Sequence, residues 1–449
     1  MKRWLVLAVL ASCKDSGTDR TKLARSDRAA PAVELVDRSA GPAGSDRPAE
    51  REPNGGPDTA ATLGDGVRGA LDGEVDVDVY RLRTEGPRLL AARLSGMAGI
   101  DGKLELRDEH FAVVATGDRG GAGVGEGFPN ISLDKGEYFL VVREVAHKPP
   151  KPKKGVDAGP AGRVGPSPGY ELTAVLSTDP PAGAEREPDE DAGSANDVLL
   201  GAPATGYLGW GGDVDVWKLA IDGLADGDGL DVTVSAVDKV AVTVEVTDAA
   251  GRRLVRSTGG PGQPVVLRSL APRVSPGEPT VQFIAISGKP ANPDAPYQLD
   301  VVSRLLDLDE EAEPNDALDR GNPLRYGAEE QGTMRGELGP GDVDRFALSP
   351  PAAAGSFDVV VDAPAGLDLV LEITGAATGK ADRGGPGVAE QLLAIAVPAH
   401  GTIGVKISAK PDKKAGPGAY QLRWSLSQPS GADAPPLAPG DEDPMPPEE

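Results

Sequence analysis

The chain has 449 residues, of which 60 are glycine and 42 are proline, and aromatic residues make up only 4%. This length favours several domains, and the glycine and proline content disfavours long helices, so we expect short strands joined by turns. The formal charge of −24 argues against a broad nucleic-acid-binding surface, because phosphate would be repelled. An acidic chain of this kind suits divalent cations instead.

The N-terminal segment has the pattern of an export signal. Lys2 and Arg3 precede an apolar run at 4–11, which is far shorter than the ~20 residues of a membrane-spanning helix. The next residues, Leu10-Ala11-Ser12-Cys13, resemble the lipobox of bacterial lipoproteins. The resemblance implies a signal peptide at 1–12 and acylation of Cys13, the only cysteine in the sequence. The alternative is a cytosolic start with an incidental cysteine.

Two further segments show no hydrophobic periodicity. Residues 13–49 are rich in Asp, Arg, Ser, Pro and Ala, and we expect a flexible tether there. Residues 429–449 predict a disordered, acidic, proline-rich tail. Lys14 stands where enteric lipoproteins retained at the inner membrane carry aspartate, so by analogy we expect a lipid anchor in the outer membrane of a bacterial cell envelope.

Between these segments one pattern occurs three times, in residues 50–178, 185–303 and 311–428, and it is the strongest signal in the sequence. Each copy opens with an acidic Glu-x-Glu-Pro run, continues to an Asp-x-Asp strand, and closes on a strand that begins with tyrosine. Short strands separated by Gly and Pro, without a helical period, predict an all-β fold. We expect three tandem antiparallel β-sandwich domains that are jelly-roll-like.

The combined pattern, EPN…A…G…GDxDxYxF…G…Y.L.V, resembles the bacterial pre-peptidase C-terminal (PPC) domain in all three copies. The resemblance implies β-sandwich modules of the kind appended to secreted peptidases. Some relatives in clostridial collagenases bind calcium and collagen. No peptidase unit accompanies the repeats in this sequence, so a protease activity does not follow from the resemblance.

Two aspartates, one residue apart, open a strand in each copy. Strand side chains alternate between faces, so both aspartates share a face with the following aromatic residue and leucine, which we expect to be the core face. Carboxylates at i and i+2 can converge on one Ca²⁺, which requires further oxygen ligands from elsewhere. The six aspartates are Asp76 and Asp78, Asp213 and Asp215, and Asp342 and Asp344.

In the calcium-binding collagenase relatives, a Glu-x-Glu-x-Asn-Asp segment contributes ligands, and by this resemblance the third copy fits calcium best. The first copy has Gly55 in place of the last acid, and the second has Asp189 in place of asparagine. The alternative is that the aspartates only accept turn hydrogen bonds from backbone N–H groups. The ligands expected in the third copy are Glu311, Glu313, Asn315, Asp316, Asp342 and Asp344.

One loop, at 147–169, is basic although the chain is acidic. Its lysines either lie in a solvated loop or contact anionic envelope polymers such as lipopolysaccharide or peptidoglycan. The candidate ligand-binding residues are Lys148, Lys151, Lys153 and Lys154.

The sequence contains no recognisable catalytic motif. The three histidines, His110, His147 and His400, belong to no HExxH motif, and there is no G-x-S-x-G elbow. We therefore expect a non-catalytic envelope lipoprotein that binds an envelope protein or glycan for adhesion or scaffolding, with calcium as its candidate cofactor. Two alternatives remain, a divergent hydrolase with a site between units and an accessory for the secretion or folding of exported enzymes.

Overall fold

The computed structural model describes residues 47–145, 163, 165–178, 181–272, 277–317, 320–325, 330–339, 341–348, 354–410 and 417–427. The expected signal peptide with Cys13, nearly all of the expected tether, the four lysines of the basic loop, and the expected tail lie outside these residues. The described part is all-β and contains no α-helix, so it offers no helix long and apolar enough to cross a lipid bilayer.

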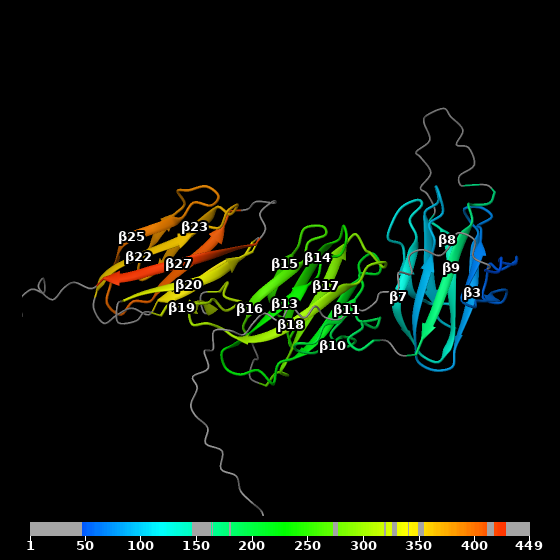
Figure 1. The fold of residues 1–449 in the computed structure, drawn as a ribbon, viewed down its shortest axis with the longest axis horizontal. Helices are drawn as coiled ribbons and strands as arrows, with labels where there is room; N and C mark the ends of the chain where they lie inside the picture. Colours follow the sequence, from blue (N-terminus) through cyan, green and yellow to red (C-terminus); the bar gives the residue numbers. More distant parts are fainter. Residues whose placement is uncertain are drawn as a thin grey trace, which may run out of the picture. The chain divides into compact units, whose positions relative to one another are not determined.

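The strands form three pairs of sheets, which we call modules 1, 2 and 3 (Figure 1). Module 1 consists of β1 (Ala61–Thr62), β2 (Gly66–Gly69), β3 (Val77–Thr84), β4 (Arg88–Leu94), β5 (Gly102–Arg107), β6 (Val113–Gly117), β7 (Glu126–Leu133), β8 (Gly136–Glu144) and β9 (Tyr170–Ser177). Module 2 consists of β10 (Asn196–Val198), β11 (Ala204–Gly206), β12 (Val214–Ala220), β13 (Asp228–Val234), β14 (Ala241–Asp248), β15 (Arg253–Thr258), β16 (Val265–Leu270), β17 (Val281–Lys289) and β18 (Tyr297–Leu305). Module 3 consists of β19 (Asn322–Pro323), β20 (Gln331–Leu338), β21 (Val343–Leu348), β22 (Gly355–Asp362), β23 (Leu369–Gly375), β24 (Gly379–Ala381), β25 (Glu390–Val397), β26 (Ile403–Ala409) and β27 (Gly418–Ser427).

The three modules share one topology. Each has a five-stranded sheet, with the orders β1-β3-β8-β5-β6, β10-β12-β17-β14-β15 and β19-β21-β26-β23-β24. Each also has a four-stranded sheet, with the orders β2-β9-β4-β7, β11-β18-β13-β16 and β20-β27-β22-β25. Pairing is antiparallel except that the short first strand of each five-stranded sheet runs parallel to its neighbour. The sequence repeat therefore corresponds to a repeat of strand order.

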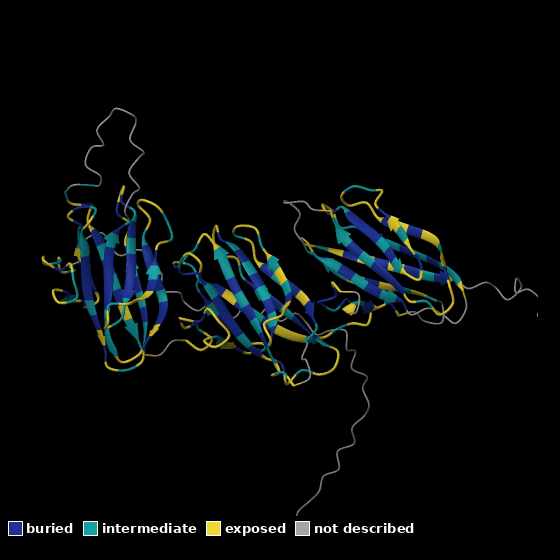
Figure 2. Cartoon of the chain, turned by 180° about the vertical axis from the view of Figure 1, so that it is seen from behind, coloured by how far each residue is buried: buried dark blue, intermediate teal, exposed yellow. Residues whose placement is uncertain are grey.

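Hydrophobic side chains from both sheets of a module form its core, and each module has a core cluster of its own. Along β14, Val242, Val244 and Val246 are buried while the residues between them are only half-buried, and Figure 2 shows this alternation along the strands. The alternation follows from the period of two in a pleated strand. It directs every second side chain between the two sheets.

The expected core face of the Asp-x-Asp strands is confirmed. Tyr80, Trp217 and Phe346 are at most 1% exposed. The leucines two residues further along each strand are also buried. Burial of each of these large side chains contributes roughly 1.5–3 kcal/mol, so the strand is fixed with its aspartates on the inward face.

Candidate metal centres

The acidic run of each module connects its two sheets next to the Asp-x-Asp strand. In module 2 the Glu185 amide donates to the carbonyl of Thr205 on β11 (2.9 Å), and the Val216 amide on β12 donates to the carbonyl of Asp189 (3.2 Å). The first glutamate of the other two runs makes the same bond to β2 and to β20. The runs and the aspartates, which are distant in sequence, therefore meet at one edge of each sandwich.

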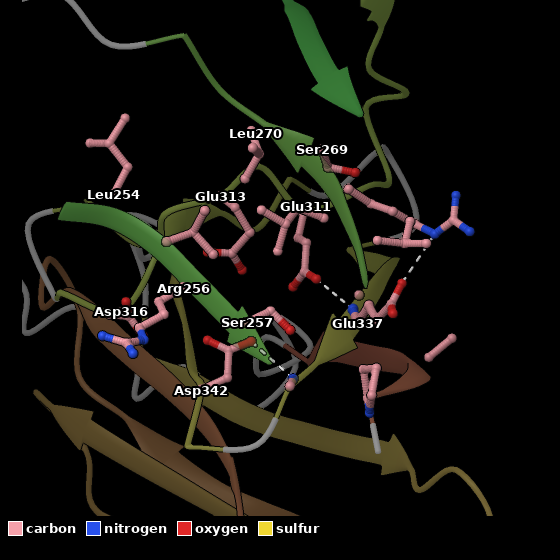
Figure 3. A pocket seen from close by; sticks show the side chains of 18 of the residues that line it. Leu254, Arg256, Ser257, Ser269, Leu270, Glu311, Glu313, Asp316, Glu337 and Asp342 are labelled. Atoms are coloured by element: carbon pink, nitrogen blue, oxygen red, sulfur yellow. Dashed lines mark hydrogen bonds and ion pairs between the residues drawn. The ribbon is translucent and has the colours of Figure 1, made fainter. Parts of the chain in front are cut away.

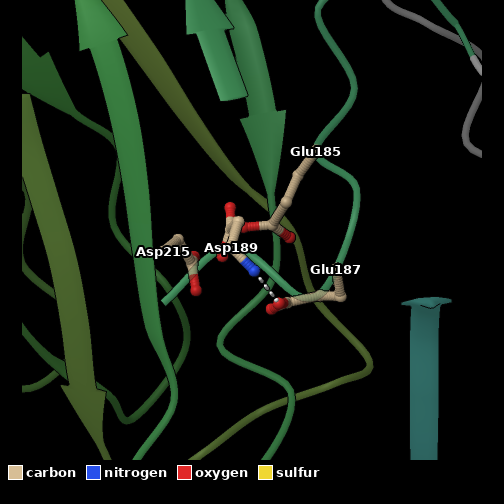
Figure 4. Close-up of side chains that lie close together, drawn as sticks. All are labelled: Glu185, Glu187, Asp189 and Asp215. Carbon is tan, nitrogen blue, oxygen red and sulfur yellow. Dashed lines mark hydrogen bonds between the residues drawn. The ribbon is translucent and has the colours of Figure 1, made fainter. Parts of the chain in front are cut away.

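Four carboxylates converge in module 2: Glu185, Glu187, Asp189 and Asp215 each place an oxygen within 4.8 Å of the others (Figure 4). All four residues are at most 1% exposed. Three come from the acidic run and one comes from β12. Among the described residues, no lysine or arginine forms an ion pair with these four carboxylates.

Part of this cluster is held by hydrogen bonds. Glu185 accepts from the Tyr207 amide (2.9 Å) and from the Tyr297 hydroxyl (3.3 Å). The Asp189 amide donates to Glu187 (2.9 Å), and the Asn196 side-chain amide donates to Asp189 (2.6 Å). These bonds orient the carboxylates, and other oxygens of the cluster have no described donor.

Five buried carboxylate oxygens in module 2 accept no hydrogen bond from a described protein group. They are Glu187 Oε1, Asp189 Oδ1, Asp213 Oδ1, Asp215 Oδ1 and Asp215 Oδ2. Burial is the largest cause of raised pKa values here, to about 7 for Asp189 and for Asp213, and neighbouring carboxylates add to it. The pKa of Asp215 is raised well above its usual range by burial and by Glu185. Such a group of acids is costly at neutral pH unless a cation neutralises it.

The donor set of module 2 fits calcium. All of the candidate ligand atoms in this four-residue cluster are carboxylate oxygens, and four of them are unpartnered and buried. Ca²⁺ takes 6–8 oxygen ligands, whereas structural zinc sites are built mainly from cysteine and histidine. Mg²⁺ keeps several waters and is held by few carboxylates. A hard ion with a large, flexible coordination shell therefore suits these residues best.

Module 3 brings together three of the six ligands expected from the sequence, Glu311, Glu313 and Asp344. Glu311 accepts hydrogen bonds from the Tyr420 hydroxyl (2.9 Å) and from the Glu337 amide. Three oxygens of this cluster have no described donor, namely Glu313 Oε1 and both oxygens of Asp344.

The other three expected ligands in module 3 have local hydrogen bonds. Asn315 is fully buried, and its side-chain oxygen accepts from the Arg345 amide (3.3 Å). Asp316 is exposed and accepts from the Val343 amide (3.3 Å). Asp342 accepts from the Gly339 amide (3.1 Å) and from the amide of the residue that follows it.

Module 1 has the smallest set of free oxygens. Glu50, Glu52 and Asp78 converge, but Glu52 is exposed. Tyr170 donates to Asp78 Oδ2 (2.6 Å), and Tyr80 donates to Glu50 (2.9 Å). Burial, followed by repulsion from Glu50, raises the pKa of Asp78 to about 8. By the number of buried, unpartnered carboxylate oxygens, module 2 is the best candidate calcium site, followed by module 3 and then module 1. The sequence had favoured the third copy.

The two aspartates of each pair have different surroundings. The first, Asp76, Asp213 or Asp342, accepts a backbone N–H from the turn before the strand. The second belongs to the carboxylate cluster. Both interpretations of the Asp-x-Asp pattern therefore apply to the same strand. Its first aspartate accepts a turn hydrogen bond, and its second aspartate converges with the carboxylates of the acidic run.

Sequence reasoning missed two kinds of site residue. The tyrosines that open the last strand of each module donate hydrogen bonds to cluster carboxylates, although in the sequence they only mark the repeat: Tyr170, Tyr297 and Tyr420. Their recurrence was the available signal. Asn130 of module 1 donates its side-chain amide to Glu185, and nothing in the sequence pattern indicates that contact.

A pocket of about 780 Å³ borders the module 3 cluster and is lined by Glu311, Glu313, Asp316 and Asp342 (Figure 3). Its other charged lining residues are Arg253, Arg256, Arg268, Glu310, Arg335 and Glu337. The pocket is lined by both charged and apolar residues, and its acidic part borders the module 3 cluster. Of the histidines, His110 and His400 are exposed and lie in none of the clusters, and His147 lies outside the described residues.

The solved structures that this chain resembles are all distant from it. The sequence matches no protein-family profile and no curated protein. A solved PPC domain of a collagenase from Bacillus anthracis is 19% identical, with 99% of that chain covering 29% of this one at a TM-score of 0.18. The CUB1-EGF-CUB2 region of human MASP-1/3 is 7% identical (54% of this chain, 100% of that chain, TM-score 0.16). A triple jelly-roll protein from the turret of an archaeal virus is 9% identical (82% of this chain, 84% of that chain, TM-score 0.19).

Proposed function

We propose that this chain is a non-catalytic binding protein of the cell envelope whose β-sandwich modules are stabilised by calcium, with the strongest site in module 2. One observation carries the proposal: Glu185, Glu187, Asp189 and Asp215 converge in a buried place where no described cationic side chain pairs with them. An unpaired buried carboxylate costs several kcal/mol, and four together cost more because they repel one another.

Calcium has a structural role in this proposal. Glu185, Glu187 and Asp189 belong to the acidic run before the module, and Asp215 belongs to β12. An ion held by both segments fastens the run to the sandwich. Because the ion binds the folded state and not the dispersed carboxylates of the unfolded chain, it stabilises the module by mass action.

The repeated β-sandwich architecture supports the proposed binding role. Loops joining short strands are the usual carriers of recognition, and three modules on one chain gain avidity when each binds weakly. The expected partners are envelope proteins or glycans. The basic loop with Lys148, Lys151, Lys153 and Lys154 supplies a local positive charge for anionic polymers, although it lies outside the described residues.

Titration calorimetry of the full chain, after removal of divalent ions with EDTA, tests the calcium proposal. We expect saturable heat with calcium, a higher melting temperature, and a much weaker response to magnesium. The Asp189→Asn variant should bind more weakly, because one carboxylate of the module 2 cluster is lost. A chain that gives no heat and no melting shift with calcium would show that the clusters hold no calcium.

The envelope location has a separate test. Acylation of Cys13 predicts that the chain takes up a palmitate analogue in a bacterial host and fractionates with the outer membrane. A Cys13→Ser variant should lose both properties while it keeps its calcium response. Equal labelling of the two chains would contradict the lipid anchor and leave the calcium proposal unaffected.

A further inference from the structure

The acidic run of module 2 also pairs with the preceding module. The Glu187 amide donates to the Asn130 carbonyl (3.1 Å), and the Ser132 amide donates to the Glu187 carbonyl (2.7 Å). Glu187 thus forms a parallel bridge with Ile131 on β7, the edge strand of its four-stranded sheet. The run serves as a short extra strand on that edge.

The same pairing recurs one module later. The Glu313 amide donates to the Ser269 carbonyl (2.9 Å), and the Ala271 amide donates to the Glu313 carbonyl (2.6 Å). Glu313 forms a parallel bridge with Leu270 on β16. Two acidic runs therefore dock on the preceding edge strand through the same pair of backbone bonds.

Sheet register identifies the corresponding edge of module 3. Ile131 and Leu270 lie immediately beyond a bulge and pair inward with Leu90 and Leu230. In module 3 the residue beyond the same bulge is Ile395, which pairs with Phe357 on β22. β25 is likewise the edge of its sheet. The backbone groups that correspond to the two docking bonds are the Ala394 carbonyl and the Ala396 amide, and among the described residues no strand pairs with this outer side.

Exposure distinguishes the free edge from the two covered ones. Ile131 is 2% exposed and Leu270 is 3% exposed, whereas Ile395 is only half-buried and Ala394 and Ala396 are exposed. Leu393 is 53% exposed. A large apolar side chain beside uncovered strand backbone is a site at which another strand can add.

The residues that correspond to Leu393 contact the following module. Arg268 forms an ion pair with Glu337 (3.2 Å). Pro129 lies so close to Gly209 that a Cβ added to that glycine would be 3.3 Å from the proline ring. Leu393 therefore stands at the position that contacts the following module in modules 1 and 2. In module 3 the described residues provide no such contact.

The first acidic run is the matching free segment. Glu52 is exposed, whereas Glu187 is fully buried and Glu313 is 8% exposed. Within the described residues, neither the amide nor the carbonyl of Glu52 has a backbone partner. One end of the described chain thus has an unpaired run, and the other has an unpaired edge of the kind that receives it.

We infer that the outer edge of β25 binds the run Glu50–Asn54 of a second copy of this chain. Glu52 of one copy lies opposite Ile395 of the other, with its amide donating to the Ala394 carbonyl and its carbonyl accepting from the Ala396 amide. The interface is head-to-tail, so copies extend into rows or close into rings. This inference does not depend on calcium or on the lipid anchor.

Cysteine cross-linking between two full-length variants tests the register. In a Cys13→Ser background, a chain with Arg51→Cys is mixed with a chain with Ala394→Cys under mild oxidation. The parallel register places these residues opposite each other, at the separation of neighbouring strands, which a disulfide can span. We expect a mixed disulfide dimer. A chain with Glu85→Cys, whose position is exposed on module 1, replaces the Arg51→Cys chain as the control and should cross-link far less.

Sedimentation at increasing concentration provides the second readout. We expect the mass of the unmodified full chain to rise with concentration and Leu393→Lys to reduce this rise. The matched control is Val113→Lys on β6, because Val113 is 52% exposed. A chain that stays monomeric throughout, or association that Leu393→Lys and Val113→Lys affect equally, would overturn the inference. Equal cross-linking of the Arg51→Cys and Glu85→Cys chains would also do so.

Discussion

Asp213 and Asp215 are one residue apart and share the inward face of their strand, yet only Asp213 accepts a backbone hydrogen bond. Asp213 accepts from the Gly209 amide, whereas neither oxygen of Asp215 has a described donor. Both are buried, at 3% and 0% exposed. The two positions therefore differ in role: Asp213 shapes a turn, whereas Asp215 lies among other buried carboxylates.

Asp215→Asn should stabilise the calcium-free protein and remove most of its calcium response. It removes one buried charge from the cluster, and an uncompensated buried charge costs several kcal/mol, so its removal should stabilise the calcium-free fold. Thermal melts at pH 8, in EDTA and in calcium, measure both effects. Asp226→Asn, in an exposed turn of the same module, is the control and should change neither. If Asp215→Asn kept the full calcium shift, Asp215 would not be a ligand.

The effect of pH should depend on calcium. In the calcium-free fold, the pKa values of Asp189 and Asp213 are raised from 3.8 to about 7, mainly by burial. The protonated forms are favoured by folding, so this stabilisation is complete below pH ~4 and is lost as the pH rises through about 7. We therefore expect the melting temperature in EDTA to fall between pH 5 and pH 8.

Calcium should reverse that trend, because it binds the deprotonated carboxylates. The calcium-induced rise in melting temperature should be larger at pH 8 than at pH 5, by about 3 °C or more if the difference is near 1 kcal/mol. Calorimetric scans at both pH values provide the measurement. A calcium shift that is independent of pH would mean that the raised carboxyl groups do not hold the ion.

The two equivalent tyrosines allow a matched comparison. Tyr297 donates to Glu185 and accepts from the Trp217 indole N–H (2.8 Å), whereas Tyr420 donates to Glu311 and its neighbour at the position of Trp217 is Phe346. Tyr297→Phe leaves the indole N–H buried without a partner and should cost about 1–3 kcal/mol. Tyr420→Phe should cost less. Urea unfolding of the two variants measures the difference, and equal costs would show that the indole bond adds little.

Glu105 provides a contrast, since it is buried but has cationic partners. It is 2% exposed and lies 2.5 Å from both Arg107 and Arg143. Burial acts to raise its pKa, but the hydrogen bonds and the positive charges of the two arginines together outweigh burial and lower it. Its stabilising effect is thus present above the unfolded pKa and is lost as the pH falls through the folded pKa.

Glu105→Gln should therefore destabilise module 1 at pH 7 by roughly 1–3 kcal/mol, and calcium should not restore the loss. The control is Glu137→Gln, because Glu137 is about 29% exposed in its ion pairs with Arg81 and Arg83 and such pairs contribute little. Urea unfolding at pH 7 and at pH 4 checks both the size and the pH dependence. Equal losses in the two variants would contradict the distinction.

Much of the fold was predictable because its signals are local. The alternation of apolar residues in β14 and the inward face shared by Asp215 and Trp217 follow from strand periodicity. The repeat of acidic run, Asp-x-Asp strand and tyrosine strand predicted three copies of one all-β unit. These features depend on neighbours within a few residues or on comparison of the copies, and both are present in the sequence.

The tertiary structure decided which of these residues meet. The sequence preferred the third copy for calcium because of Asn315 and Asp316, yet the four-carboxylate cluster is in module 2, where Asp189 replaces the asparagine. The contact from Asn130 to Glu185 and the docking of Glu187 on β7 both join residues that are far apart along the chain. Strand periodicity fixes only the face on which a side chain lies, whereas burial, donors and edge pairing depend on what the folded chain places opposite that face.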